Sequence, residues 1–406
     1  MSISQKLVYS ELSKSLTSSI ENLEKKNNGI YFTPPETIYS NIHFLQPYLE
    51  NVNYILEPSC GSCEFIIQLK MINEDFKITG IELNQTIFDS IQQFKSDKIE
   101  LLNENFITYE FNKKFDLIIG NPPYFVMKKK DVKNDYQNYF EGRPNIFILF
   151  IIKSLSLLNE NGIVSFILPK NFLNCLYYDK TRKHIMKNYN ILSITECRDK
   201  YLETQQDTIT IVIQNKLPSS NNLLFSLNVS EYTIFGCKDN IKILKSLYHD
   251  SNSLDNLGFI VKVGNVVWNQ CKKILTNDSN ETLLIYSSDI SDNKLSIKKY
   301  KNKDKKNYIL KKGINDTLLV INRGYGMGNY NMNYCIINEY ENINYLIENH
   351  LIYIKCKEDI EKDILEKHNK KIIDSFNDSK TKQFISLYFG NNAINTTELS
   401  KILPIY

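Results

Sequence analysis

An apolar run that ends in a glycine and two prolines is the feature that most restricts how this chain folds. Residues 116–124 read Asp-Leu-Ile-Ile-Gly-Asn-Pro-Pro-Tyr. The branched run has the length of a buried strand, and the glycine and prolines prevent the strand from continuing. Asn121, Pro122, Pro123 and Tyr124 are therefore expected at the carboxyl end of a strand, where open parallel sheets bind their ligands.

The chemistry of this tetrapeptide favours a planar substrate that carries an amino group. Two consecutive prolines fix φ and remove two backbone donors, so the turn is rigid. The Asn121 carboxamide oxygen and the Pro122 carbonyl oxygen can accept hydrogen bonds from an exocyclic NH2. The Tyr124 ring offers a stacking face. The alternative is that the tetrapeptide only connects a strand to the next helix. This alternative is less well supported because a loop of cofactor-binding type lies upstream.

That upstream loop has the pattern of a nucleoside site. Residues 54–57 form a short apolar strand that runs into the small residues 58–63 and then into a helix that ends near Met71. Small residues let a ligand approach the backbone, and a helix N-terminus favours electron-rich groups. The next strand, residues 76–81, ends in Glu82, whose carboxylate is placed to accept both hydroxyls of a ribose. The loop is not Gly-x-Gly-x-x-Gly, so a dinucleotide is less well supported.

Strands and helices alternate around these two loops, which predicts an α/β protein. Residues 1–28 are expected to form a polar helical arm without chemistry of its own. Thr33 is expected to cap a helix over residues 36–49. Further strands are predicted at residues 99–102, 162–169, 191–196 and 208–214, and further helices at 145–158 and 178–189.

The motifs, in this order, resemble those of the N6-adenine DNA methyltransferases of type II restriction-modification systems, in the γ arrangement. They are Tyr-Phe-Thr-Pro-Pro-Glu at 31–36, Glu-Pro-Ser-Cys-Gly-Ser-Cys-Glu-Phe at 57–65, Gly-Ile-Glu-Leu-Asn at 80–84 and the tetrapeptide. The resemblance is strong over residues 29–215 and weak beyond them. It implies a class I S-adenosylmethionine-dependent methyltransferase fold, Rossmann-like with a mostly parallel seven-stranded sheet, followed by a C-terminal α+β target-recognition domain.

The resemblance implies S-adenosylmethionine as the methyl donor. Glu82 would bind its ribose hydroxyls, with Leu83 beside its adenine. Asn105 replaces the aspartate that usually contacts the adenine amino group, and Cys63 stands where glycine is usual, so weaker cofactor binding is expected. The full set implied for the cofactor is Tyr31, Thr33, Glu57, Pro58, Ser59, Cys60, Gly61, Glu82, Leu83, Asn105, Phe106, Asn121 and Phe150.

The resemblance also implies that the target adenine leaves the duplex stack to reach the tetrapeptide. Its N6 would donate to the Asn121 and Pro122 oxygens while its ring stacks on Tyr124, so that orientation and electrostatics carry the rate. Tyr201 is the candidate for a second aromatic that stacks on the extruded base. The lysines at 128–130 lie in a loop expected to be mobile over the site, either solvated or tracking phosphates. The catalytic set is Asn121, Pro122, Pro123, Tyr124 and Tyr201.

A change of composition near residue 217 predicts a second domain, since 406 residues exceed one ordinary core. The expected parts are an arm (1–28), a catalytic domain (29–216) and a DNA target-recognition domain (217–406) that opens with a linker at 218–222. The last part mixes lysines suited to phosphates with asparagine and arginine suited to base edges. The candidate DNA-binding residues are Trp268, Asn269, Lys272, Arg323 and Tyr325.

The remaining features of the sequence concern the protein's location, its cysteines and its partners. The absence of a signal peptide or a long apolar stretch predicts a soluble, cytoplasmic protein without a membrane partner. The eight cysteines are expected to be free thiols, and no metal site is expected because a second Cys-x-x-Cys is missing. Double-stranded DNA is the expected partner, with a companion restriction endonuclease left open. Three alternatives stay open: an RNA adenine methyltransferase, a protein glutamine N5-methyltransferase and a catalytically weak DNA-binding protein.

Overall fold

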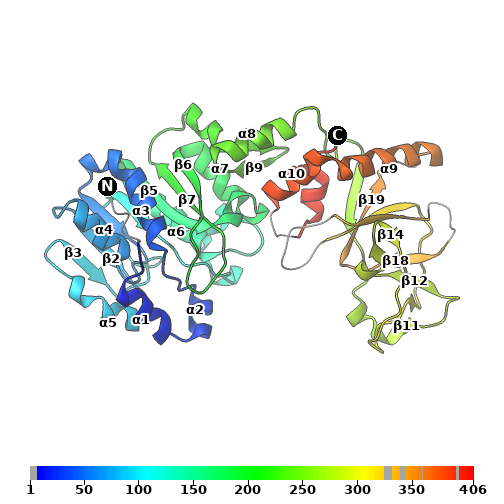
Figure 1. The fold of residues 1–406 in the computed structure, drawn as a ribbon, viewed down its shortest axis with the longest axis horizontal. Helices are drawn as coiled ribbons and strands as arrows, with labels where there is room; N and C mark the ends of the chain where they lie inside the picture. The colour runs from blue at the N-terminus through cyan, green and yellow to red at the C-terminus, as the bar shows by residue number, and fades with distance from the viewer. Residues whose placement is uncertain (1–6, 324–331, 339–342, 359, 390–392) are drawn as a thin grey trace. The chain divides into compact units, whose positions relative to one another are not determined.

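The computed structural model describes residues 7–323, 332–338, 343–358, 360–389 and 393–406 (Figure 1). It divides into two compact units, residues 1–242 and 243–406. Each unit has its own sheets and its own buried clusters. In the described part of the chain, no helix combines the length and the apolar character needed to cross a bilayer.

The first unit is built on a seven-stranded sheet in the order β3-β2-β1-β4-β5-β7-β6. Neighbours from β3 to β5 run parallel, whereas β7 is antiparallel to both β5 and β6. This is the predicted mostly parallel methyltransferase sheet with its closing hairpin, so the predicted fold class is confirmed. The strands are β1 (Tyr54–Glu57), β2 (Lys77–Ile81), β3 (Ile99–Leu102), β4 (Phe115–Gly120), β5 (Leu158–Pro169), β6 (Asn190–Cys197) and β7 (Thr208–Gln214).

Helices cover both faces of this sheet, which explains why β4 is apolar without alternation. Successive side chains of a strand point to opposite faces. Ile118 lies in the cluster that includes the residues of α6. Leu117 and Ile119 lie in the cluster that includes α3 and α4. The helices are α3 (Pro35–Leu45), α4 (Glu64–Ile72), α5 (Gln85–Ser90), α6 (Ile146–Ser156) and α7 (Asp179–Asn188).

The chain reverses its direction of travel across the sheet between β1 and β4. It moves outward from β1 to β3 and then returns to place β4 against the other edge of β1. Such a reversal leaves a crevice at the carboxyl ends of the two central strands. The loops after β1 and β4 both open into it.

The amino-terminal arm is two helices, α1 (Glu11–Ser19) and α2 (Asn22–Asn28), and it packs on the first unit. Leu16 and Ile20 are buried against Phe32 and Ile87. Ser13 lies 2.8 Å from the Ser62 hydroxyl and donates to Glu64 at 2.7 Å. The arm is therefore attached to the loop after β1.

The predicted cap of α3 is wrong. The helix begins after Pro34 without a side-chain cap and ends at Leu45, followed by the 3-10 turn η1 (Gln46–Asn51). The Thr33 hydroxyl instead accepts a hydrogen bond from Asn121. The two prolines already fix the φ angles of the first turn, which leaves the hydroxyl available to a neighbouring strand loop.

The first unit continues past β7 through η7 (Ser220–Leu224), β8 (Ser226–Val229) and β9 (Tyr232–Phe235), and it ends within α8 (Lys238–Leu247). The polar stretch expected to be a linker is attached to the edge strand. Asn222 is buried, accepts from Ile191 N at 2.7 Å and donates to Tyr189 O at 2.9 Å. The units divide between Lys242 and Ile243, beyond the expected boundary between 216 and 217, because this asparagine fastens the segment to β6.

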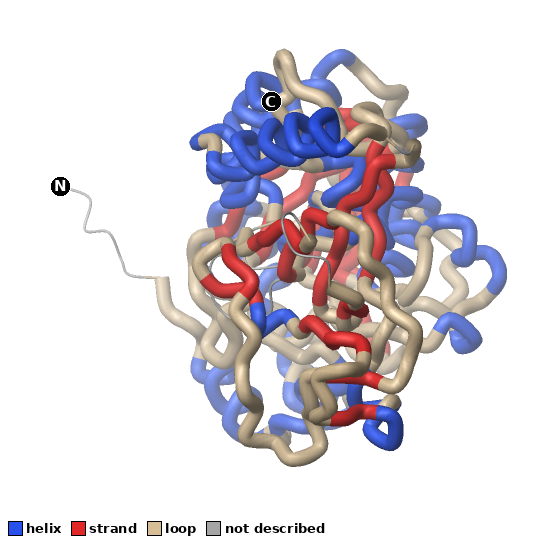
Figure 2. Tube along the Cα trace, turned by 90° about the vertical axis from the view of Figure 1, so that its right-hand side faces the viewer, coloured by secondary structure: helices blue, strands red, loops and turns tan. Residues whose placement is uncertain are grey.

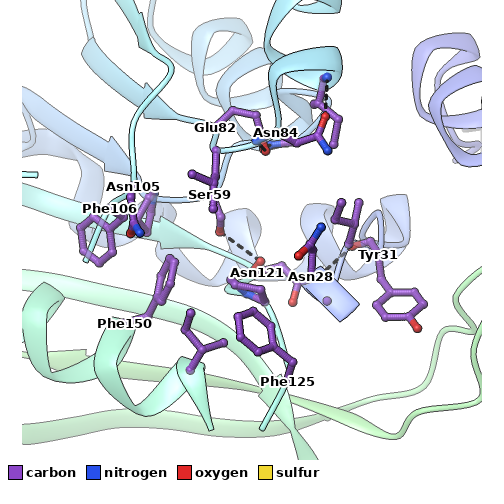
Figure 3. A pocket seen from close by; sticks show the side chains of 18 of the residues that line it. Asn28, Tyr31, Ser59, Glu82, Asn84, Asn105, Phe106, Asn121, Phe125 and Phe150 are labelled. Atoms are coloured by element: carbon purple, nitrogen blue, oxygen red, sulfur yellow. Dashed lines mark hydrogen bonds between the residues drawn. The ribbon is translucent and has the colours of Figure 1, made fainter. Parts of the chain in front are cut away.

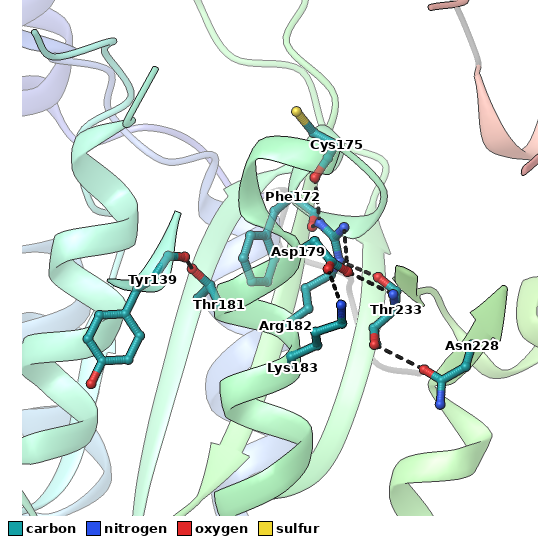
Figure 4. A network of polar contacts seen from close by, with 9 residues as sticks. All are labelled: Tyr139, Phe172, Cys175, Asp179, Thr181, Arg182, Lys183, Asn228 and Thr233. Atoms are coloured by element: carbon teal, nitrogen blue, oxygen red, sulfur yellow. Dashed lines mark hydrogen bonds and ion pairs between the residues drawn. The ribbon is translucent and has the colours of Figure 1, made fainter. Parts of the chain in front are cut away.

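Arg182 of α7 holds the β8–β9 hairpin in place (Figure 4). It is fully buried, and its Nε donates to the Thr233 carbonyl at 2.6 Å. Its Nη1 donates to the carbonyls of Phe172 and Cys175, each at 2.9 Å. One side chain thus joins the helix, the hairpin and the loop after β5.

The second unit is an α+β structure with two four-stranded sheets, ordered β10-β19-β16-β17 and β11-β15-β12-β18, and a small β13–β14 hairpin. Figures 1 and 2 both show α9 and α10 gathered at one end of these strands. The elements are β10 (Phe259–Val263), β11 (Leu275–Thr276), β12 (Thr282–Ile285), β13 (Ile290–Ser291), β14 (Lys294–Leu295), β15 (Tyr308–Ile309), β16 (Leu318–Asn322), β17 (Tyr334–Ile337), β18 (Tyr345–Ile347), β19 (Leu351–Cys356), α9 (Lys362–Asn377) and α10 (Ser379–Tyr388).

Candidate active site

A cavity of about 540 Å³ lies at the carboxyl ends of the central strands of the first unit. This volume is in the range of sites for small ligands and cofactors. Figure 3 shows Phe106 and Phe150 on one side of it, Glu82 and Asn84 on another, and Asn121 near its centre. Ten residues of the cofactor set line the cavity: Tyr31, Pro58, Ser59, Gly61, Glu82, Leu83, Asn105, Phe106, Asn121 and Phe150.

Three residues of the cofactor set do not line the cavity. Thr33, Glu57 and Cys60 are all buried. The Cys60 sulfur lies 3.2 Å from the position that a Cβ on Gly80 would occupy, so this side chain faces the core of the sheet. The Cys60 side chain is therefore directed away from the cavity.

Other residues line the cavity that sequence reasoning did not select. Gly29 is the most informative, because it ends α2 with φ +66°, and a Cβ there would lie 2.6 Å from Tyr124 N. A glycine directly after a lysine-rich helix end was the signal for such a turn. Asn28, the last residue of the arm, also lines the cavity, so the end of the arm borders the site. The unselected lining residues are Asn28, Gly29, Ile30, Phe32, Asn84, Gln85, Ile87, Glu104, Phe125, Met127 and Ile146, together with Pro123 of the catalytic set.

Glu82 joins the loops after β1 and β2. One carboxylate oxygen accepts from Asn84 N at 2.8 Å and the other accepts from Gly61 N at 3.0 Å. Burial raises the pKa of this carboxyl, while these backbone N–H groups act in the opposite direction. A carboxylate has about four lone-pair sites, so acceptor capacity remains for hydroxyl groups in the cavity.

Glu57 is a buried carboxylic acid with one oxygen that has no hydrogen-bond partner among the described residues. Burial raises the pKa of its carboxyl well above the ordinary value, and the nearby Cys63, Glu64 and Glu82 add to the rise. Its Oε2 is buried without a hydrogen-bond partner among the described residues. A cationic group placed next to it would supply the missing charge and donor. The surroundings of this loop therefore suit a positively charged ligand.

The two departures from the family pattern have different structural settings. Cys63 has φ +63°, a left-handed conformation that favours glycine, which explains why glycine is usual there. Asn105 lines the cavity, and its Oδ1 already accepts from Ile107 N at 2.9 Å. Next to it, the Phe106 and Phe150 rings are 4.8 Å apart. These rings form an apolar wall suited to a planar ligand.

The carboxamide of Asn121 has a defined orientation. Its Nδ2 donates to Thr33 Oγ1 at 3.0 Å and to the Tyr31 carbonyl at 3.3 Å. Figure 3 shows the Tyr31 ring turned away, so only the main chain approaches. Its Oδ1 accepts from the Tyr124 hydroxyl, which also lies 2.8 Å from the Ile167 carbonyl. The acceptor oxygen is therefore directed away from Thr33 and toward Tyr124.

Tyr124 and Tyr201 both reach Asn121. The Tyr201 hydroxyl is 3.5 Å from Asn121 Nδ2, and its ring is buried, with 7% exposed. The Tyr124 ring packs edge-on against Phe147 with centroids 6.1 Å apart. Burial, and then the neighbouring Tyr201, raise the pKa of the Tyr124 hydroxyl well above its usual value. The structure thus brings together the side chains of Asn121, Tyr124 and Tyr201, with Pro122 buried beside them.

The segment after the tetrapeptide contains two 3-10 turns, η3 (Lys129–Asp131) and η4 (Asn134–Tyr139). Val132 and Phe140 of this segment are buried in the core. The lysines at 128–130 are exposed. These buried anchors hold the segment to the sheet, while its lysines face solvent.

The candidate DNA-binding residues of the second unit have separate settings. Trp268 begins η8 (Trp268–Gln270) and packs half-buried on the cluster around Tyr286. Asn269 is exposed, and Lys272 pairs with Asp304 at 2.8 Å. Arg323 follows β16, and its Nε is buried without a hydrogen-bond partner among the described residues. Tyr325 lies outside the described residues.

Two backbone contacts bring the Trp268 and Arg323 segments toward one turn. Val266 accepts from Asn349 N at 2.9 Å, and Arg323 N donates to the His350 carbonyl at 3.4 Å. Both segments therefore adjoin the turn between β18 and β19. Residues that are distant in the sequence meet at this end of the second unit.

Comparison with known proteins gives a family match for the first unit and full-length relatives. Residues 13–202 match the family described as Eco57I restriction-modification methylase. The type II methyltransferase M.CvrRI of Paramecium bursaria Chlorella virus XZ-6E is 26% identical over 397 residues, covering 94% of this chain and 95% of that protein. The modification methylase CviBIII of Paramecium bursaria Chlorella virus NC1A is 27% identical over 410 residues, covering 98% of this chain and 99% of that protein. A type I restriction-modification methyltransferase subunit from Streptococcus thermophilus aligns with a TM-score of 0.40 at 14% identity, over 58% of this chain and 57% of that chain.

The matched region contains the residues that surround the cavity, and both viral relatives align through the second unit as well. The resemblance drawn from the motifs is therefore confirmed. Its motif order, its sheet and these relatives identify the chain as a relative of the type II restriction-modification methyltransferases.

Proposed function

We propose that this protein transfers a methyl group from S-adenosylmethionine to N6 of an adenine extruded from duplex DNA. The orientation of Asn121 carries the proposal. Its amide hydrogens are engaged by Thr33 and Tyr31, so the acceptor oxygen is presented at the end of β4, where an amino group would be received. The names of the two viral relatives, a type II methyltransferase and a modification methylase, support the same reaction class.

The residues around the cavity fit this cofactor. Glu82 retains acceptor capacity for the ribose hydroxyls, and Phe106 and Phe150 form a wall for the adenine ring. The unpartnered Oε2 of Glu57 suits a cationic cofactor, because a positive charge nearby would compensate a buried carboxylate. When bound, S-adenosylmethionine supplies an electrophilic methyl group. The Asn105 Oδ1 accepts from Ile107 N, so one of the two lone pairs of this oxygen is already engaged.

The chain itself would act on the adenine by orientation and charge. The Asn121 oxygen and the Pro122 carbonyl accept the two N6 hydrogens and raise electron density on that nitrogen. In the described structure the Tyr124 hydroxyl occupies the Asn121 oxygen, so base entry requires this hydroxyl to turn away. Its ring and that of Tyr201 then bracket the base. Extrusion of the base is needed because N6 is unreachable inside the duplex.

The second unit would read the DNA sequence. Its exposed lysines suit phosphates, and Asn269 and Arg323 suit base edges. The two viral relatives also align over this unit, which supports a role for it in the same reaction. We propose a modification enzyme that acts beside a restriction endonuclease or alone.

The test is methyl transfer itself. The protein is incubated with labelled S-adenosylmethionine and with unmethylated duplex DNA, RNA or release factor in separate samples, and the product is digested to modified units. Label in N6-methyladenine from DNA is expected, with Asn121→Ala slowed roughly 100- to 1000-fold. Label only in RNA or in glutamine would refute the proposed substrate, and full activity of Asn121→Ala would refute the proposed role of the carboxamide.

A further inference from the structure

The loop that carries Tyr201 has two side-chain anchors placed symmetrically around that residue. It connects β6 to β7 without helix or strand. Two residues before Tyr201, Asp199 accepts from Thr37 Oγ1 at 2.7 Å. Two residues after it, Glu203 accepts from Lys25 Nζ at 2.5 Å. Both partners belong to segments that precede the sheet in the sequence.

The side chain of Lys25 is buried, which is unusual for a lysine. It is 4% exposed, and its ammonium donates to the Thr17 carbonyl at 2.7 Å as well as to Glu203. The Glu203 side chain retains 27% exposure. A lysine ammonium is rarely buried unless it is paired, and a pair shielded from water is stronger than an exposed one. The contact between arm and loop is thus a specific ion pair.

The backbone of the same lysine shapes the cavity wall. The carbonyl of Lys25 accepts from Ile30 N at 3.0 Å and from the N–H of Gly29, the residue that ends α2. Residues 28–31, at the end of the arm and directly after it, line the cavity. The main chain of Lys25 therefore fixes the turn beside the cofactor site, while its side chain fixes the loop of Tyr201.

We propose that Lys25 is a positioning residue for methyl transfer, acting through Glu203 to hold Tyr201 against Asn121. This inference rests on the proposed function and extends it to the arm. The ring of Tyr201 lies next to the acceptor amide only while its loop is held down, since the loop has no strand or helix of its own. The ion pair links this loop to α2 of the arm.

The experiment compares Lys25→Met and Glu203→Gln with Lys14→Met as the matched control. Lys14 forms a solvent-exposed pair with Glu11 at 2.7 Å on the same arm. Single-turnover methylation of duplex DNA is expected to slow about tenfold in each of the first two variants and less than about twofold in the control. Binding of S-adenosylmethionine by calorimetry is expected to change less than about threefold, because both substitutions leave the main-chain contacts of Lys25 with Gly29 and Ile30 in place.

A cycle with Tyr201→Ala separates positioning from a general loss of stability. If Lys25 acts through Tyr201, adding Lys25→Met to the Tyr201→Ala protein does not slow methyl transfer further. The double variant Lys25→Met/Glu203→Gln should likewise transfer the methyl group no more slowly than the slower of its two single variants. Equal slowing by Lys25→Met with and without Tyr201 would overturn the inference, as would a wild-type rate in both pair variants. Glu203→Gln gives the same answer from an exposed loop if Lys25→Met folds poorly.

Hydrogen exchange supplies a readout that does not need activity. Lys25→Met and Glu203→Gln are expected to raise amide exchange over residues 199–205 at least about threefold, whereas Lys14→Met leaves that segment unchanged. Unchanged exchange in both pair variants would overturn the inference. An inactive wild-type protein would instead count against the proposed function, and the exchange result would still decide the role of Lys25.

Discussion

Replacing Thr33 by valine tests whether its hydroxyl orients the Asn121 carboxamide. Thr33 does not line the cavity, although the family resemblance assigns it to the cofactor. Its Oγ1 lies 3.0 Å from Asn121 Nδ2, nearer than the Tyr31 carbonyl at 3.3 Å and the Tyr201 hydroxyl at 3.5 Å. Valine keeps the shape of the side chain and removes only the acceptor.

The size of the effect follows from the hydrogen bonds that remain. Losing one neutral hydrogen bond between partly buried groups weakens the preferred amide orientation by about 1–2 kcal/mol. A barrier change of this size slows methyl transfer roughly 5- to 30-fold. The Tyr31 carbonyl still accepts, so the loss stays below the roughly 100- to 1000-fold expected when the carboxamide itself is removed in Asn121→Ala. Thr33→Ser keeps the hydroxyl and is expected to stay within about threefold of wild type.

The assay measures single-turnover methylation together with cofactor affinity. We expect Thr33→Val to slow transfer while the dissociation constant of S-adenosylmethionine stays unchanged. A valine variant as fast as the serine variant would show that the hydroxyl does not orient the amide. A dissociation constant that rises in step with the loss of rate would return Thr33 to the cofactor, as the resemblance alone implies.

Three further perturbations follow from the buried polar groups of the first unit. Glu57→Gln is expected to weaken cofactor binding and to stabilise the free protein. Because the pKa of Glu57 is raised in the folded state, the stability of the wild-type protein falls as the pH rises above the ordinary pKa of 4.5. The stability gained by the variant should therefore increase over that pH range in thermal melts. Cofactor affinity equal to wild type would remove Glu57 as the partner of a cation. Arg182→Met is expected to cost about 3–5 kcal/mol in urea unfolding, against less than about 1 kcal/mol for Lys183→Met on the same helix, and similar losses would contradict the buried carbonyl contacts. Asn105→Asp is expected to tighten S-adenosylmethionine about 5- to 30-fold by calorimetry, since one oxygen can keep Ile107 N while the other faces the cavity, and weaker binding would contradict this geometry.

Local patterns predicted the sheet of the first unit because each strand is short, apolar and bounded by turn residues. The end of β4 at Gly120 and the whole of β7 lie where the sequence places them. The carboxylate at the end of β2 was foreseen for the same reason, since strand ends define the crevice. These features depend on neighbours in the sequence, which a pattern can register.

Contacts between distant segments escaped the same reasoning. The Thr33 hydroxyl looked like a helix cap, because the sequence does not show that Asn121 brings a donor to it. Asn222 looked like part of a linker, because asparagine is common in turns, yet it is buried and bonded to Ile191 of the edge strand β6 and to Tyr189, the residue that ends α7. Lys25 was not singled out within the polar arm, since no residue near it in the sequence indicates a contact with Glu203. In each case the partner of the polar residue comes from elsewhere in the chain.

The basic run of the second unit shows why a count of lysines overstates contact with DNA. Within residues 298–306, the Lys305 ammonium lies 4.0 Å from the ring centroids of both Tyr286 and Tyr300. Burial lowers the pKa of Lys305 from its usual value, so this cation is held by aromatic faces within the fold. Lys306 donates to the Leu275 carbonyl at 3.1 Å. The remaining lysines of the run are exposed, and their side chains have no partner among the described residues. Within the run, only these lysines can bind phosphates without first losing an intramolecular contact. The salt dependence of DNA binding should therefore follow those four positions, at 298, 299, 301 and 303, rather than the whole run.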